Sequence, residues 1–276
     1  MITCKLQGGL GNQLFQIFTT ISYALDHSKP FFFLNNYQLG SGSNRETIRY
    51  TYWETLLSSL KPFLKNMEQI PKLEIIKEIN YNYQILPEPL SNILLVGYFQ
   101  SPKYFDKFKS SICKLLKIDN KKKELLPITS DTISMHFRLG DYLKYPHIYY
   151  ILDSVYYYNA ISHILDRQTN KIQKVLYFCE NDDFDAVQET IEILQLKFQF
   201  LEFVRADSLL NDWEQLLLMS LCNYNIIANS TFSWWGAYLN NNENKIVCYP
   251  EHWFKPESNI NTYDLFPDNW ITISCS

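Results

Sequence analysis

The sequence predicts an α/β fold made of two domains that face a cleft. Apolar segments with the character of buried strands alternate with helix-like segments over most of the 276 residues, and this alternation is typical of βαβ units with parallel sheets. A polar, lysine-rich stretch, Lys117–Ser130, separates two such blocks. We therefore expect one α/β domain over residues 1–122 and a second over residues 123–276, both of ordinary domain size.

The first block opens with a short apolar strand, Ile2–Leu6, that runs into a glycine turn. Apolar residues then recur at helical spacing as far as Leu25. The pair Ser101-Pro102 has the residue types of an N-cap and a first helical position, and it predicts a helix that reaches Leu116. The other elements expected here are strands at Phe31–Leu34 and Ile93–Phe99, helices at Thr51–Leu64 and Pro71–Ile79, and a flexible Gly/Ser-rich loop at Leu39–Asn44.

The second block repeats the alternation. Asn211 and Glu214 have the spacing of a capping box at the start of one of its helices. The strands are expected at Thr132–Phe137, Lys174–Phe178, Phe198–Val204, Tyr224–Ala228 and Lys245–Tyr249. The helices between them are expected at Ser154–Leu165, Asp182–Leu194, Asp212–Leu221 and Thr231–Leu239.

Composition excludes several classes of protein. A hydrophobic content of 46% is ample for a core, and a net charge of −4 argues against a nucleic-acid partner, which favours a basic face. The six cysteines are scattered without a Cys-x-x-Cys pair, so we expect free thiols in a reducing compartment and no zinc site. No segment has the apolar length of a membrane span and no signal peptide is evident. We expect a soluble, cytoplasmic protein without a transmembrane segment.

The glycine turn Gly8-Gly9-Leu10-Gly11-Asn12-Gln13 joins the first strand to the first helix. A dinucleotide fingerprint would need a third glycine where Leu14 stands and an acid where Asn35 stands, so that interpretation is weak. One alternative is a tight turn that simply needs glycine. The other is a loop in which Gly11 and the amides of Asn12 and Gln13 contact a ligand, and these amides favour it.

A second motif, His136-Phe137-Arg138-Leu139-Gly140-Asp141-Tyr142, ends the first strand of the second block. Alternate residues of a strand share a face, so we expect His136 and Arg138 to point the same way. A guanidinium group there can grip a diphosphate with two hydrogen bonds and stabilise a departing nucleotide. Asp141 is a candidate to orient Arg138 or to act as a base. The structural alternative is an Arg138–Asp141 ion pair.

A third motif, Asn229-Ser230-Thr231-Phe232-Ser233-Trp234-Trp235-Gly236, reads as a strand that ends in a helix N-cap. Backbone N–H groups at such a helix start suit an anion such as a diphosphate. The candidate ligand-binding residues in this segment are Asn229, Ser230, Thr231 and Ser233.

A fourth segment, Phe178-Cys179-Glu180-Asn181-Asp182-Asp183, places three carboxylates after another strand. It can be interpreted as a metal site, as an N-cap with an acidic first helical turn, or as an acid that reads a base or ribose, for which Asp182 is the candidate. We favour the last two interpretations together, because no second acidic cluster accompanies this one.

These motifs, together with Gly97-Tyr98-Phe99-Gln100-Ser101 and Met219-Ser220-Leu221-Cys222, occur in an order that closely resembles the α-1,2-fucosyltransferase family, glycosyltransferase family 11. The resemblance runs from residue 7 to about residue 254. It implies a GT-B-like pair of Rossmann-type domains around a central cleft, with the acceptor bound on the first domain and the nucleotide-sugar donor on the second. It also implies inverting transfer of L-fucose from GDP-fucose to a sugar hydroxyl, commonly the 2-hydroxyl of galactose, on an oligosaccharide or glycoconjugate acceptor, without a metal or other cofactor.

The resemblance also implies roles for single residues. Arg138 matches the arginine that binds the donor diphosphate in the family's His-x-Arg-Arg-Gly-Asp motif, and Asn12 is expected near the sugar. The family's second arginine is Leu139 here, which motivates an alternative donor with another activated deoxysugar such as rhamnose. A catalytically silent glycan-binding protein is a further alternative. The residues expected to hold the nucleotide are Ser230, Thr231 and Ser233, and the loops expected to shape the acceptor site are Leu39–Tyr52 and Tyr81–Asn92.

Overall fold

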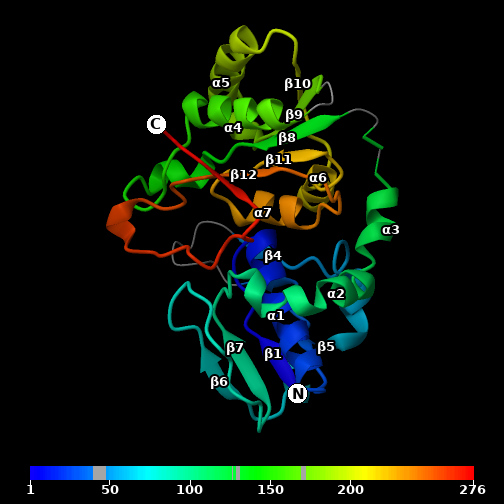
Figure 1. The fold of residues 1–276 in the computed structure, drawn as a ribbon. Coiled ribbons are helices and arrows are strands. Elements are labelled where there is room, and N and C mark those ends of the chain that lie inside the picture. Colours follow the sequence, from blue (N-terminus) through cyan, green and yellow to red (C-terminus); the bar gives the residue numbers. More distant parts are fainter. Residues whose placement is uncertain (40–47, 126, 129–130, 169–171) are drawn as a thin grey trace. The chain divides into compact units, whose positions relative to one another are not determined.

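The structure is a computed structural model of residues 1–276, and it describes all of them except 40–47, 126, 129–130 and 169–171 (Figure 1). It divides into two compact units. The first comprises Met1–Lys121 with Asn261–Pro267, and the second comprises Lys122–Ile260 with Asp268–Ser276. Each unit contains a parallel sheet with helices, which confirms the predicted α/β class. The GT-B-like arrangement of the two domains stays a prediction, and the loop predicted at Leu39–Asn44 lies outside the described residues beyond Leu39.

The first unit is built on a parallel sheet with the strand order β1-β7-β6. These strands are β1 (Ile2–Cys4), β6 (Glu74–Lys77) and β7 (Ile93–Val96). The helix α1 (Leu10–Asp26) follows β1 and packs beside it, and its apolar residues are buried almost throughout. The strand and the helix predicted at the start of the chain are therefore confirmed. Two small ladders complete the unit: β2 (Phe33–Leu34) with β5 (Leu64–Lys65), and β3 (Gln38–Leu39) with β4 (Arg49–Tyr50).

Two predicted helices of the first unit are wrong. Pro71–Ile79 contains the strand β6, because Ile75 and Ile76 are β-branched and pair with β7 as an edge strand. Thr51–Leu64 forms turns and then the 3₁₀ helix η1 (Ser58–Phe63), in which Pro62 lacks the backbone donor that an α-helix needs.

The helix predicted after Ser101-Pro102 is interrupted. The hydroxyl of Ser101 accepts a hydrogen bond from the Lys103 backbone N–H, so the predicted N-cap is confirmed. The segment then continues as separate pieces, because Phe105 and Phe108 leave helical geometry at the junctions. These pieces are η3 (Pro102–Tyr104), η4 (Asp106–Phe108) and α2 (Lys109–Leu115), and α3 (Ile118–Lys123) follows inside the predicted linker.

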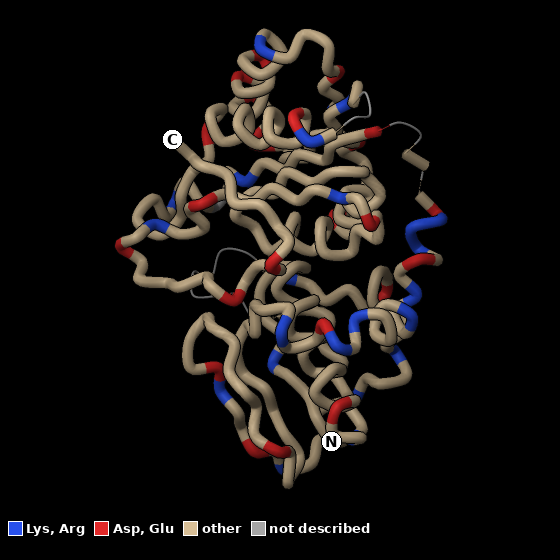
Figure 2. The backbone as a smooth tube through the Cα atoms, in the orientation of Figure 1, with Lys and Arg blue, Asp and Glu red and all other residues tan. Residues whose placement is uncertain are grey.

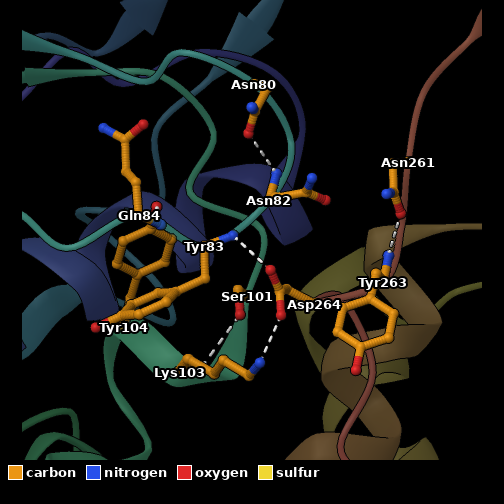
Figure 3. A network of polar contacts seen from close by, with 10 residues as sticks. All are labelled: Asn80, Asn82, Tyr83, Gln84, Ser101, Lys103, Tyr104, Asn261, Tyr263 and Asp264. Atoms are coloured by element: carbon orange, nitrogen blue, oxygen red, sulfur yellow. Dashed lines mark hydrogen bonds and ion pairs between the residues drawn. The ribbon is translucent and has the colours of Figure 1, made fainter.

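Residues 261–267 join the first unit through Asp264 (Figure 3). The Asp264 carboxylate, only 11% exposed, accepts a hydrogen bond from the Tyr83 backbone N–H at 2.9 Å and pairs with the Lys103 ammonium at 2.5 Å. The Lys103 ammonium also lies 5.7 Å from the centre of the Tyr263 ring. This largely buried carboxylate therefore helps to fix a short return segment to the first unit.

The second unit holds a six-stranded, fully parallel sheet with the order β10-β9-β8-β11-β12-β13. Five of its strands and all four of its α-helices were predicted. The strands are β8 (Thr132–His136), β9 (Lys174–Phe178), β10 (Glu202–Arg205), β11 (Tyr224–Ile226), β12 (Val247–Pro250) and β13 (Ile271–Ile273). The helices are α4 (Ser154–Arg167), α5 (Phe184–Lys197), α6 (Asp212–Met219) and α7 (Thr231–Tyr238), with the 3₁₀ turns η5 (Gly140–Lys144), η6 (Asn181–Asp183) and η7 (Pro256–Ser258). The capping box of Asn211 and Glu214 is confirmed.

The sheet of the second unit is buried on both faces. Val175 and Tyr177 pack into the core cluster that includes residues of α4 and α5, whereas Leu176 and Phe178 pack into a second cluster with residues of α6. Alternate residues of one strand therefore face opposite sides of the sheet. Figure 1 shows α4 and α5 on one side of this sheet and α6 and α7 on the other. The inner strands β8 and β11 carry no Lys, Arg, Asp or Glu (Figure 2).

Among the residues that the structure describes, no helix combines the length and apolar character needed to cross a bilayer.

Candidate functional site: the carboxyl edge between two strands

The strand order of the second unit marks one place on its sheet. Counted along the chain from β8, the order is 3-2-1-4-5-6, so the direction of winding reverses between β8 and its neighbour β11. In open parallel sheets, ligands bind outside the carboxyl ends of the strands at such a switch point. The segments at the carboxyl ends of β8 and β11 include His136–Arg138 and Asn229–Ser233, both singled out from the sequence. The order also defines a Rossmann-type sheet.

Arg138 lies just beyond the end of β8, with its side chain 18% exposed. Its guanidinium group donates a hydrogen bond to the carboxylate of Glu180, which follows the neighbouring strand β9. The guanidinium carbon also lies 5.3 Å from the centre of the Tyr142 ring, a cation–π contact. Leu139, by contrast, packs against the hydrophobic core. Leu139 and the Arg138 guanidinium group therefore lie in different surroundings.

His136 is the last residue of β8 and is only 7% exposed. Burial, with the nearby charge of Arg138, lowers its pKa to about 3, so the imidazole is neutral near pH 7. Its ring lies 5.5 Å from the ring of Phe232 at the start of α7. In the described part of the chain, Nδ1 of His136 is buried without a hydrogen-bond partner. This residue can take part in hydrogen bonds but brings no positive charge to an anion.

Asn229 and Ser230 shape the junction between β11 and α7. The Asn229 amide donates to the carbonyl groups of Tyr150 and Trp253 at 2.8 and 3.0 Å, while its Oδ1 is buried and unpaired among the described residues. The Ser230 hydroxyl accepts a hydrogen bond from the Phe232 backbone N–H, so the predicted N-cap is confirmed.

Ser233 and Thr231 differ in exposure. Ser233 is 1% exposed, and its hydroxyl donates to backbone carbonyl groups of the same turn. Ser233 therefore holds the turn in the structure as it stands. Thr231 is the first residue of α7 and is half-buried. The helix behind it is anchored by Trp234 and Trp235, which are both fully buried.

Two residues of the acidic segment after β9, neither selected in the sequence analysis, contact the residues that follow β8. Asp183, 7% exposed, accepts hydrogen bonds from the Gly140 backbone N–H on both carboxylate oxygens, at 3.0 and 2.9 Å. This bond ties the turn after β8 to the turn after β9. Glu180 pairs with Arg138, as described above. The selected residue Asp182 is exposed in the first turn beside them.

The interpretations of this segment can now be compared with its geometry. Acidic residues do occupy its first helical turn, but neither Glu180 nor Asp183 makes a side-chain cap to the turns that follow them. Within the described ranges, no group of three His, Cys, Asp or Glu side chains is arranged to hold a metal ion. The side chain of Asp141 lies outside the part of the chain that the structure describes, so its proposed role as a base stays a prediction.

The glycine turn belongs to the first unit. Gly8 has a φ of +80°, and a Cβ atom there would lie 2.5 Å from the Asn12 side chain, so the turn does require glycine. Gln13 is fully buried and donates to the carbonyl groups of Gly8 and Tyr50, so it holds the turn. Gly11 is buried within α1.

Asn12 is the half-buried member of the glycine turn, and its side-chain oxygen accepts a hydrogen bond from the Gln100 amide at 3.0 Å. Gln100 comes from the Gly97–Ser101 motif that follows β7. Two motifs 88 residues apart in the sequence therefore meet at the carboxyl edge of the small sheet.

Comparison with known proteins shows which family the chain belongs to. The model of the family described as glycosyl transferase family 11 matches residues 1–274. An α-1,2-colitosyltransferase of Escherichia coli is 25% identical to the chain, with 99% of each protein covered. The O-antigen biosynthesis glycosyltransferase WbnK of Escherichia coli is 29% identical, with 99% of this chain and 100% of the relative covered.

The fold and the comparisons together define the class of protein. A Rossmann-type sheet with an arginine and a helix N-terminus at its switch point offers a place suited to a phosphorylated ligand. The chain is a glycosyltransferase, and it belongs to glycosyl transferase family 11. The resemblance found from the sequence motifs is thereby confirmed.

Proposed function

We propose that this enzyme transfers L-fucose from GDP-fucose to a saccharide hydroxyl with inversion, forming an α-1,2 linkage to the 2-hydroxyl of galactose. The observation that carries the proposal is Arg138, which lies beside the switch point of a 3-2-1-4-5-6 sheet in a chain of family 11. We propose that residues 123–276 bind the donor. Residues 1–122, with Gly11 and Asn12 at the glycine turn, serve the acceptor side.

Three parts of the second unit contact the departing nucleotide in this proposal, and each has its own role. Arg138 binds the diphosphate and offsets the negative charge that grows as the glycosidic bond to the sugar breaks. The start of α7, with Ser230 and Thr231, offers backbone N–H groups and hydroxyls to the same phosphates. His136, neutral and with a buried unpaired nitrogen among the described residues, contributes a hydrogen bond rather than a charge.

Inversion requires that the acceptor hydroxyl attack from the face opposite the departing diphosphate, and that its proton be taken up. We propose Asp141 as the base, because it lies in the same motif as Arg138, three residues further along the chain. We further propose that no metal is needed, because a guanidinium group and a helix N-terminus can together stabilise the departing diphosphate. The reaction belongs in a reducing compartment, the cytoplasm, since the described cysteines are all free thiols.

The test is an assay of transfer by Arg138→Ala beside a matched control, Arg167→Ala. Arg167 is an exposed arginine at the end of α4 in the same unit. The protein is incubated with GDP-fucose and a panel of galactose-terminated oligosaccharides, and products are detected by mass spectrometry. We expect Arg138→Ala to lose at least about 100-fold in kcat/KM, the scale of one electrostatic transition-state contact. Arg167→Ala should stay near wild type. Full activity of a folded Arg138→Ala protein would contradict the proposal.

A second donor has a specific observation in its favour. One relative is named as an α-1,2-colitosyltransferase, and colitose is fucose without its 3-hydroxyl. A site that hydrogen-bonds this hydroxyl rejects the analogue strongly, by about 10⁴-fold, whereas an apolar site discriminates only weakly. Measuring kcat/KM for GDP-fucose, GDP-colitose and a GDP-rhamnose donor with one acceptor therefore separates the candidates. A preference for GDP-colitose would replace fucose in the proposal.

A further inference from the structure

We propose that Glu180 is an internal competitor of the donor diphosphate for Arg138, and that it thereby sets the affinity of the enzyme for its nucleotide. This inference rests on the proposed function, because it assigns a role to Glu180 at the same diphosphate site. Glu180 lies 42 residues from Arg138 in the sequence and reaches it from the neighbouring strand β9. Its carboxylate accepts the hydrogen bond from the Arg138 guanidinium group that a phosphate oxygen would accept in the donor complex.

The two partners of this ion pair are fixed to different degrees. The side chain of Arg138 is 18% exposed, whereas that of Glu180 is 55% exposed. A carboxylate with more than half of its surface in water can leave the pair and remain hydrated. The guanidinium group has no comparable access to solvent. Glu180 is therefore the partner that moves when a stronger anion arrives.

Arg138 has a second support that does not depend on Glu180. Its guanidinium group lies over the ring of Tyr142. That ring is stacked on Tyr149, with the ring centres 3.8 Å apart and 10° between their planes, and the Tyr142 hydroxyl donates to the Asn229 carbonyl at 2.8 Å. Tyr142 is thus held on two sides. Arg138 therefore keeps its cation–π contact with Tyr142 after Glu180 moves away.

Gly140 leaves room for the Glu180 carboxylate. A Cβ atom at position 140 would lie 3.1 Å from Glu180 Oε2, and the φ of +30° at this residue also favours glycine. The Gly140 backbone N–H is in turn fixed by Asp183. The turn after β8 is therefore shaped so that the carboxylate can reach the guanidinium group.

The contact points to competition for Arg138 rather than to support of it. The two roles predict opposite changes in donor affinity when Glu180 is removed. A competitor weakens donor binding, so its removal tightens binding. A positioning residue strengthens donor binding, so its removal weakens it. Exposed ion pairs have a small net strength, which corresponds to a gain of about 1.5- to 5-fold in affinity for a phosphate ligand when Glu180 is neutralised.

The experiment is calorimetric titration of the full chain with GDP in wild type, Glu180→Gln and a matched control, Glu202→Gln. Glu202 begins β10 at the amino edge of the same sheet, is 67% exposed and also pairs with a basic residue, Lys174. Both substitutions remove one negative charge from the same unit. Glu180→Ala serves as a second variant if glutamine keeps a hydrogen bond to Arg138.

The expected result is a Kd for GDP that falls about 1.5- to 5-fold in Glu180→Gln and stays at the wild-type value in Glu202→Gln. An unchanged or higher Kd in both Glu180 variants overturns the inference, and a higher value would assign Glu180 to positioning Arg138. An equal fall in Glu202→Gln would also overturn it, because the effect would then come from net charge. Absence of GDP binding in the wild type would contradict the proposed function instead.

Discussion

Replacing the buried histidine at the end of β8 should change how the stability of the second unit depends on pH. His136 has a folded-state pKa of about 3, whereas an unfolded histidine titrates near 6.5. Between pH 3 and pH 6.5, His136 is therefore mostly protonated in the unfolded chain and mostly neutral in the folded chain. Stability from this residue is therefore intact above pH 6.5 and is lost as the pH falls toward 3.

The size of this loss follows from the two pKa values. At pH 5 the unfolded histidine is protonated about 30 times out of 31, whereas the folded one is almost fully neutral, which corresponds to about 2 kcal/mol. At pH 7.5 the same calculation gives less than about 0.1 kcal/mol. Wild-type protein should thus lose about 2 kcal/mol through His136 between pH 7.5 and pH 5, and His136→Gln should lack this part of the loss.

Urea unfolding followed by tryptophan fluorescence provides the assay. Trp53 lies in the first unit, and the other five of the six tryptophans lie in the second, so the signal reports mainly on the unit that contains His136. The control is His147→Gln, which changes an exposed histidine of the same unit and should keep the wild-type pH dependence. An equal loss of stability on acidification in wild type and His136→Gln would refute the reasoning.

Two further predictions concern other buried polar contacts. Asn225 is fully buried and is hydrogen-bonded to Ser134, the Met219 carbonyl and the Asn240 amide. Asn225→Leu should lower the free energy of unfolding in urea by about 3 kcal/mol because it leaves those groups unpaired. The control Asn244→Ala, at an exposed position, should change it by less than about 0.5 kcal/mol. A loss below about 1 kcal/mol for Asn225→Leu would contradict this. Asp264→Ala should speed hydrogen exchange at the Tyr83 amide, which donates to that carboxylate; unchanged protection there would show that the contact is unimportant.

The second block was predicted well because its elements follow simple patterns. Val175 and Tyr177 alternate with Leu176 and Phe178 in a strand buried on both faces, so a continuous apolar run identifies β9. The strand β13 was missed. It has only three residues, and a polar Thr272 interrupts its apolar pair, so the pattern is too short to separate from a loop.

The first block was predicted less well because its local patterns are ambiguous. The segment around Ile75 and Ile76 has apolar and charged residues at spacings that also fit a helix. It forms a strand because it pairs with β7. Tertiary pairing of this kind overrides a local preference. The 3₁₀ segments after Thr51 likewise depend on the packing of Leu56, Leu57 and Leu60, which are fully buried.

The candidate site was predicted in its parts but not in its connections. Arg138 and Ser230 were identified because their motifs follow strands, and the N-cap of α7 was identified from residue types. The pairing of Arg138 with Glu180 depends on β8 and β9 being neighbours, and strand order is not readable from a single sequence. The segment with Glu180 was noticed for its three carboxylates, yet the site analysis selected Asp182. The signal that would have found Glu180 is its place two residues after the end of β9.

The division of the chain has a practical consequence for anyone who wishes to cut it. Residues 261–267 interrupt the second unit, and β13 closes its sheet only after that excursion. A fragment that begins at Lys122 would keep six strands but would carry Asp264 without Tyr83 and Lys103. A fragment that stops at Ile260 would leave β12 as a bare edge, the kind of surface that promotes aggregation. No single cleavage point releases either half intact.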